Sequence, residues 1–129
     1  MRREDVQVWL DRYVAAWNSY DETAIAALFA ETCEYRYQPW ADPVVGRAAI
    51  VADWLSNRDE PGSWTAHYDA WAFDGERASA FGESRYTNPD GSLRTLYYNH
   101  WMLRFDGHGT CVEFIEYFME LPEELRAGH

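Results

Sequence analysis

The chain has 129 residues, a length that suits one domain over residues 1–129 because it can bury about two-thirds of the surface that the unfolded chain exposes. It carries 22 acidic against 11 basic residues, and this net charge of −11 argues against nucleic acid and anionic membranes as partners. All 11 basic residues are arginine, which excludes chemistry that needs a lysine, such as a Schiff base.

The first half of the chain is predicted to be largely helical. Apolar residues recur at helical spacing over residues 4–18, and a short second helix carries Ile25, Leu28 and Phe29. Residues 33–37 alternate as a strand does, and a third helix is expected over residues 47–57.

The second half is predicted to be a sheet. The turn signals Asp74-Gly75, Asn88-Pro89-Asp90-Gly91 and Asp106-Gly107 separate long runs of aromatic and β-branched residues, as consecutive antiparallel hairpins require. Helices that precede such a sheet predict an α+β domain, with three N-terminal helices packed on a curved, mostly antiparallel sheet.

Few features point to targeting or cofactors. The chain starts with charged residues and has no apolar run of signal or membrane-spanning length, so we expect a cytoplasmic protein. Cys33 and Cys111 fit no zinc motif and are expected to be buried thiols, and the four scattered histidines predict no metal site. No cofactor motif is present, so none is expected.

The last two strands, from Tyr97 to Glu120, contain polar residues in otherwise apolar rows. Because strand residues alternate between faces, Tyr97, Asn99 and Trp101 share the face that we assign to the core. On the returning strand, Phe114, Glu116 and Phe118 share one face. Buried polar groups such as Asn99 and Glu116 need a protein partner, a water or a ligand.

Five short motifs occur in order along the chain: Arg12-Tyr13-Val14-Ala15-Ala16-Trp17-Asn18, Leu28-Phe29-Ala30-Glu31, Val45-Gly46-Arg47-Ala48-Ala49-Ile50, Phe105-Asp106-Gly107-His108-Gly109 and Glu116-Tyr117-Phe118. With the order of elements, they make the chain resemble the SnoaL-like branch of the nuclear transport factor 2-like superfamily. The resemblance implies a cone-shaped α+β barrel with a pocket at its open end, and a homodimer formed through the outer face of the sheet. It does not settle function, because the superfamily holds cyclases, isomerases, hydrolases and proteins without catalysis.

The resemblance also tests individual positions. Tyr13 lies where similar ketosteroid isomerases place an oxyanion-hole tyrosine, but their base and protonated acid correspond to Tyr37 and Trp101. Members similar to limonene epoxide hydrolase use an Arg-x-Asp pair that corresponds to Asn99 and Trp101. Only the last acid of that site is retained, as Glu116, so the chemistry of neither relative carries over unchanged.

Two candidate catalytic residues follow. Glu116, between Phe114 and Phe118, is either a general acid or base with a raised pKa or a structural group that accepts hydrogen bonds from Arg85 or a tyrosine. The resemblance implies that Arg85 and Glu83 also face inward, where Arg85 binds a ligand oxyanion or is neutralised by Glu83 and Glu116.

The remaining candidates are ligand-binding or core residues, and the sequence leaves both roles open for each: Tyr13, Trp17, Tyr37, Glu83, Tyr97, Asn99, Trp101 and Phe114. Asn99 can both donate to and accept from a carbonyl-bearing ligand. His67 is a reserve candidate whose face the sequence does not decide.

Two functions remain open. The first is a cofactor-independent enzyme, such as an isomerase, cyclase or hydrolase, acting on a small, largely apolar oxygenated molecule. The second is a protein that binds such a ligand, or a second subunit, without catalysis. Under either function, we expect a homodimer through the residues of the outer face: Tyr98, Met102, Ile115, Tyr117 and Met119.

Overall fold

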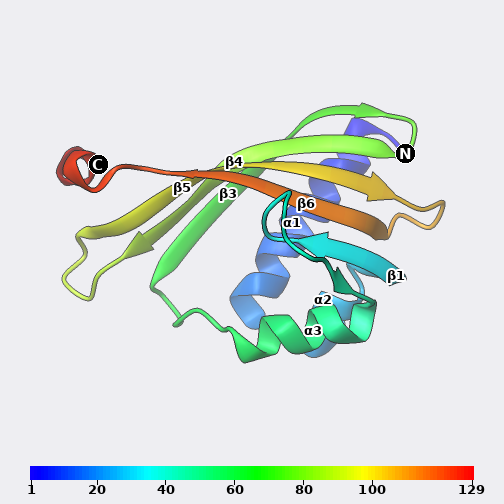
Figure 1. The fold of residues 1–129 in the computed structure, drawn as a ribbon, viewed down its shortest axis with the longest axis horizontal. Coiled ribbons are helices and arrows are strands. Elements are labelled where there is room, and N and C mark those ends of the chain that lie inside the picture. The colour runs from blue at the N-terminus through cyan, green and yellow to red at the C-terminus, as the bar shows by residue number, and fades with distance from the viewer.

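The computed structural model describes residues 1–129 and shows a curved, open sheet with three helices on its concave side (Figure 1). The predicted α+β architecture is therefore confirmed. The helices are α1 (Arg3–Ser19), α2 (Glu22–Ala26) and α3 (Arg47–Ser56), followed at the C-terminus by the short 3-10 helix η1 (Glu123–Gly128). None of the helices is both long and apolar enough to cross a membrane.

The sheet has six strands in the order β2-β1-β6-β5-β4-β3. Their bounds are β1 Phe29–Arg36, β2 Val44–Val45, β3 Trp64–Asp74, β4 Arg77–Thr87, β5 Leu93–Phe105 and β6 Cys111–Glu120. The last four pair as consecutive antiparallel hairpins, as predicted, whereas β1 pairs in parallel with β6.

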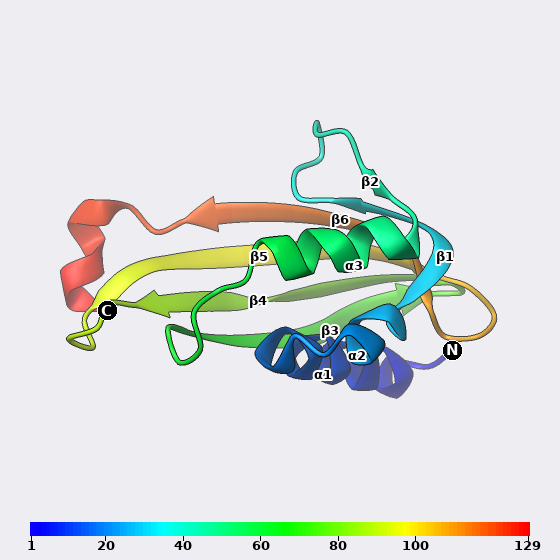
Figure 2. The same cartoon turned by 90° about the horizontal axis from the view of Figure 1, so that it is seen from below.

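Polar side chains fix α1 to the sheet. Arg3 donates to the carbonyl oxygen of Ala70 at 2.8 Å, and Gln7 both donates to the carbonyl of Tyr68 at 3.0 Å and accepts from the amide of Ala70 at 2.9 Å. These bonds hold α1 along β3, while α3 lies against β1 on the other side of the concave face (Figure 2). The two helices thus leave a space between them above the middle of the sheet.

Aromatic rings fill the core beneath this space. Trp101 stacks on Tyr68 with ring centroids 3.8 Å apart, and Phe114, which is fully buried, stacks on Tyr35 at 4.2 Å. Tyr13 of α1 lies against both Trp101 and Phe114. The first helix is therefore joined to the sheet by ring contacts as well as by hydrogen bonds.

Three local details differ from the sequence prediction. The second helix ends at Ala26, so that Leu28 lies in the turn that follows the helix and Phe29 is the first residue of β1. The strand predicted over residues 33–37 begins four residues earlier, at Phe29. The two-residue strand β2 and the helix η1 were not predicted, because neither has a long enough hydrophobic pattern to be read from sequence.

Gly82 of β4 lies opposite Tyr68 of β3, at a point where the backbone of β3 leaves no room for a side chain on β4. A Cβ atom added at Gly82 would lie 2.0 Å from the carbonyl oxygen of His67 and 2.6 Å from the ring of Tyr68. The neighbouring residues of β4 on the same face are also small, namely Ala78, Ala80 and Ser84. Small side chains on β4 therefore let the sheet curl around the space under the helices.

We predict that Gly82→Ala lowers the free energy of unfolding by about 1–3 kcal/mol, because the added methyl group must displace backbone atoms. Urea unfolding followed by circular dichroism measures the change. Gly107→Ala is the matched control, since nothing lies within 4 Å of a Cβ at Gly107. Equal stability of the two variants would show that the close approach at Gly82 does not constrain the sheet.

Candidate functional site

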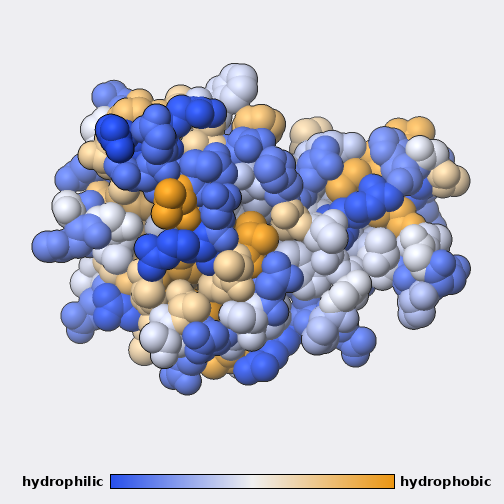
Figure 3. Space-filling view, turned by 180° about the vertical axis from the view of Figure 1, so that it is seen from behind, coloured by the Kyte–Doolittle hydropathy of each residue, from blue (hydrophilic) through white to orange (hydrophobic).

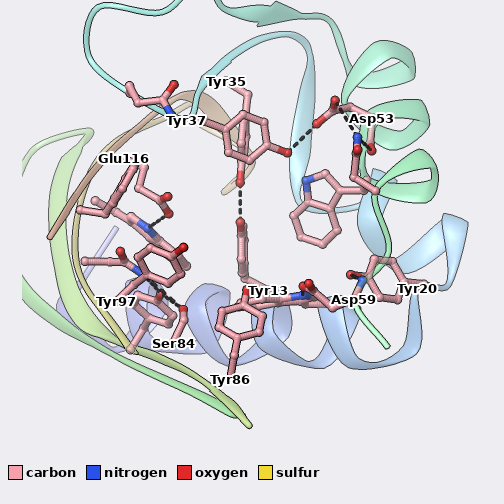
Figure 4. Close-up of a pocket in the computed structure, with 18 residues that line it drawn as sticks. Tyr13, Tyr20, Tyr35, Tyr37, Asp53, Asp59, Ser84, Tyr86, Tyr97 and Glu116 are labelled. Atoms are coloured by element: carbon pink, nitrogen blue, oxygen red, sulfur yellow. Dashed lines mark hydrogen bonds between the residues drawn. The ribbon is translucent and has the colours of Figure 1, made fainter. Parts of the chain in front are cut away.

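A cavity of about 500 Å³ occupies the space between α1, α3 and the sheet. It is lined by 18 residues, and the 11 hydrophobic ones are all aromatic. Residues of the sheet such as Glu116 and Ser84 lie on one side of this cavity, and Asp53 of α3 lies on the other (Figure 4). A cavity of this size and lining suits a small, mostly apolar molecule.

Glu116 of β6 is the acidic group on the sheet side of the cavity. Its carboxylate accepts one hydrogen bond, from the indole nitrogen of Trp101 at 2.8 Å, and it has no basic partner. Burial raises the pKa of Glu116 to about 7, and the bond from Trp101 opposes part of that rise. Near neutral pH the side chain therefore exists in both protonation states and can donate or accept a proton.

Tyr13 of α1 and Tyr35 of β1 form a hydroxyl pair near Glu116. Their oxygens are 2.5 Å apart, and both side chains are almost fully buried (Figure 4). Burial raises the pKa of Tyr13 well above its ordinary value, and the charge of Glu116 raises it further, so this hydroxyl stays protonated. The pair has two hydroxyl hydrogens, and only one of them forms the hydrogen bond between the two oxygens. The other hydrogen is left to donate to a ligand oxygen.

Asn99, Tyr68 and Ser84 form a second polar group on the sheet. The hydroxyls of Tyr68 and Ser84 are 2.6 Å apart, and the Asn99 amide donates to both of them. The amide oxygen of Asn99 is buried and has no hydrogen-bond partner in the protein. Such an orphaned acceptor is costly unless something donates to it, so it marks a place where a ligand or water donor fits.

Two aspartates lie on the helix side of the cavity. Asp53 of α3 accepts from the hydroxyl of Tyr37 at 2.5 Å, which ties α3 to the loop after β1. Asp59 accepts from the indole nitrogen of Trp17 at 2.9 Å, and its own amide donates to the hydroxyl of Tyr20. Both carboxylates thus have neutral donors as partners, and no arginine or histidine lines the cavity.

The structure places seven of the ten predicted site residues at this cavity: Tyr13, Trp17, Tyr37, Tyr97, Asn99, Trp101 and Glu116. Their roles toward a ligand remain predictions. The expected inward face of β5, with Asn99 and Trp101, is also observed, because both side chains are buried while the neighbouring His100 is exposed.

Arg85 and Glu83 do not reach the cavity, contrary to the sequence prediction. Residues directly opposite in an antiparallel pair share a face, and β5 pairs Asn99 with Gly82 and Tyr97 with Ser84. The inward residues of β4 are therefore the even-numbered ones, and Arg85 and Glu83 point outward. The guanidinium of Arg85 donates to the backbone carbonyl of His129 instead of Glu116.

Phe114 is the third predicted site residue that lies outside the cavity. It shares the inward face with Glu116, as predicted, but it is fully buried and does not line the cavity. It lies two residues deeper along β6, where the rings of Tyr13 and Tyr35 cover it. His67, whose face was undecided, is exposed on the outer face, with its Nε2 3.0 Å from the carboxylate of Asp69.

Several residues that line the cavity were not predicted from the sequence. Tyr35 and Tyr37 are two residues apart and so point to the same face, which means that the alternation of β1 could have identified Tyr35. The row of small residues on β4 could likewise have identified Ser84. Asp53 and Asp59 lie on α3 and on the loop that follows it. No sequence pattern indicates that they face the same cavity as Glu116, because only the tertiary packing brings them there.

Comparison with known proteins identifies the fold. The sequence model of the SnoaL-like domain family matches residues 10–117, whereas no curated protein sequence matches the chain. Among solved structures, the chain is similar to SalBIII, described as an epoxide hydrolase/cyclase-like enzyme in pyran ring formation in the polyether salinomycin. That match has a TM-score of 0.69 and 18% identity, and it covers 88% of this chain and 89% of the other.

Two further structures have the same fold. A ketosteroid isomerase-like protein from Kribbella flavida matches with a TM-score of 0.67, 21% identity, and coverage of 94% of this chain and 82% of the other. An NTF2-like protein of unknown function from Cytophaga hutchinsonii matches with a TM-score of 0.63, 18% identity, and coverage of 83% and 94%. At these identities the similarity establishes the fold and not the reaction.

We predict that Trp101→Phe raises the pKa of Glu116 above that of the wild type, because it removes the hydrogen bond that favours the charged carboxylate. Titration of the glutamate side-chain carbons by NMR measures the pKa in both proteins. Trp40→Phe is the control, because Trp40 is 82% exposed and does not line this cavity. An unchanged or lower pKa in Trp101→Phe would contradict the assigned role of the indole.

Proposed function

The chain belongs to the SnoaL-like family, and on this premise we propose that it is a cofactor-independent enzyme acting by proton transfer on a small, largely apolar oxygenated molecule. The observation that carries the proposal is Glu116, a carboxylate without a basic partner at the wall of an aromatic cavity, with a pKa of about 7. A group with such a pKa suits general acid or base catalysis at neutral pH.

The other polar groups supply orientation. The Tyr13–Tyr35 pair donates to a substrate oxygen, and Asn99 accepts from a substrate hydroxyl or amine. Tyr13, Tyr35 and Glu116 line the same cavity, so the three groups can act on one bound molecule. Isomerisation and ring closure are the reaction types that need only a proton moved and an oxygen polarised. The names of the two similar enzymes, a cyclase-like and an isomerase-like protein, support this class.

We predict that Glu116→Gln lowers turnover by a factor of about 10²–10⁴, the usual contribution of a general acid or base. Product formation from a panel of unsaturated ketones and epoxy alcohols, followed by NMR, measures turnover. In the wild type, the rate changes with an apparent pKa near 7, and this dependence disappears in the variant.

Glu113→Gln is the matched control, because Glu113 precedes Glu116 on the same strand but forms an outward ion pair with Arg104. It should keep wild-type turnover, since exposed ion pairs contribute little. Wild-type turnover in Glu116→Gln would exclude Glu116 as the proton-transfer group.

A second candidate function is ligand binding without catalysis. The observation that favours it is that Asn99 and Trp101, which stand at catalytic positions of better-known relatives, both donate to other protein groups here. Native mass spectrometry of the purified protein tests this candidate. A copurified ligand that the protein leaves unchanged would favour it over the enzyme.

We also propose that the protein is a homodimer formed through the outer face of the sheet. This face exposes Phe81, Tyr98, Met102, Tyr117 and Met119. The face seen from behind Figure 1 is, by contrast, mostly hydrophilic with separate apolar spots (Figure 3). An apolar sheet face is rarely left in water, and in a two-fold symmetric dimer the same exposed residues of both copies cover one another.

We predict that sedimentation velocity at micromolar concentration finds a species of twice the 15.1 kDa chain mass. The double variant Met102→Glu with Tyr117→Glu should sediment as a monomer, because it buries like charges across the interface. Val8→Glu, on an exposed position of α1, should leave the dimer intact. A monomeric wild type would refute the proposed dimer.

A further inference from the structure

The charged side chains that line the cavity are all acidic. Asp53, Asp59 and Glu116 line it, whereas none of the 11 arginines and 4 histidines of the chain does. None of the three carboxylates forms an ion pair within the protein. Carboxylates in a concave, low-dielectric site produce a focused negative potential, so the cavity attracts cations and repels anions.

The protein satisfies these carboxylates only with neutral donors. Asp53 accepts from Tyr37, Asp59 from Trp17 and Glu116 from Trp101. Hydrogen bonds of this kind orient a carboxylate, but they do not neutralise its charge. Inside a largely aromatic cavity, the missing counter-charge is the feature that a ligand can supply.

The walls suit a cation as well. Indole and phenol rings attract an ammonium or guanidinium group over their faces, and tryptophan does so most strongly. Trp17, Trp54 and Trp101 all line the cavity. One ring of the lining already has such a contact, because the guanidinium carbon of Arg58 lies 5.4 Å from the ring centroid of Tyr20.

Asn99 provides an independent sign of a ligand that donates hydrogen bonds. Its side chain is on the cavity side of the sheet, only 7% of the residue is exposed, and its amide oxygen has no partner. An N–H group of a protonated amine would satisfy this acceptor. A carboxylate or phosphate oxygen would not, because it has no hydrogen to donate.

We propose that the cavity binds an organic cation, a protonated amine on an apolar skeleton, in preference to a neutral or anionic molecule of the same shape. The inference rests on the proposed function, since it takes the same cavity as the binding site and specifies the class of its ligand. The aromatic walls hold the skeleton, the carboxylates supply the counter-charge and Asn99 accepts from the nitrogen.

Three probes of nearly equal shape test the charge preference: phenethylamine, phenethyl alcohol and phenylacetate. The quenching of tryptophan fluorescence, checked by calorimetry, gives their affinities at neutral pH. We expect phenethylamine to bind about tenfold more tightly than the alcohol, and phenylacetate to bind most weakly. Equal or weaker binding of the amine, or no amine binding at millimolar concentration, would overturn the inference.

The double variant Asp53→Asn with Asp59→Asn locates the preference in the cavity. Asparagine keeps an acceptor oxygen for Tyr37 and Trp17 but removes the charge, and the amine-to-alcohol ratio should fall severalfold. The control is Asp74→Asn with Glu76→Gln, which removes the same charge from the β3–β4 turn and should keep the ratio. A ratio that is unchanged in the cavity variant would place amine binding elsewhere and refute the assigned site.

Failure of the inference and failure of the proposed function have different signatures. Probe binding measures charge preference without any turnover, whereas Glu116→Gln measures turnover without regard to charge preference. Loss of turnover in Glu116→Gln with equal binding of amine and alcohol would refute only the amine inference. An amine preference with undiminished turnover in that variant would refute only the catalytic role of Glu116.

Discussion

The chemistry of the cavity depends on the register in which β5 pairs with its two neighbours. On one side β5 places Trp101 opposite Glu116 and Asn99 opposite Phe118, and on the other it places Asn99 opposite Gly82. Because strand residues alternate between faces, a slip by one residue would turn Asn99 and Trp101 to the outside and bring His100 inward. Glu116 would then lose its only hydrogen-bond donor. The small residues of β4 belong to the same constraint, since a Cβ atom at Gly82 would clash with the backbone of β3 in this register.

The site costs stability that the core must offset. Burial raises the pKa of Glu116 from 4.5 to about 7, so the folded state favours the neutral carboxyl. The folded state is therefore most stable with respect to Glu116 below pH 4.5, where the side chain is protonated. This stabilisation is lost as the pH rises through about 7 and the buried side chain becomes charged. The rings around Glu116, with Trp101 stacked on Tyr68 and Phe114 stacked on Tyr35, stabilise the arrangement through buried aromatic area. The carboxylate is thus kept in a poorly solvated place by packing, and not by a counter-charge.

Most of the fold could be predicted from sequence, but only part of the site could. Helical spacing, turn signals and strand parity gave the element order and the inward faces of β5 and β6, because these depend on local periodicity. Parity also indicated that Glu116 faces inward, although it could not show how deep Phe114 lies along the same strand. The face of β4 was predicted wrongly, because the resemblance implied that Arg85 and Glu83 face inward, whereas the small residues that alternate with them do so. Tertiary packing, which local patterns do not encode, brings Asp53 and Asp59 to the same cavity as Glu116.

The two proposals constrain each other. A protonated amine in the cavity would stabilise the charged form of Glu116 and lower its pKa toward the ordinary value. With such a ligand bound, Glu116 is ionised at neutral pH, so it acts as a base and not as an acid. The group that polarises the substrate oxygen must then be another one, and the Tyr13–Tyr35 pair has a hydroxyl hydrogen that is not used within the pair. Those tyrosines have raised pKa values and give up a proton poorly, so they stabilise a developing oxyanion by hydrogen bonding without transferring the proton. Binding an amine therefore assigns base catalysis to Glu116 and oxyanion stabilisation to the tyrosine pair.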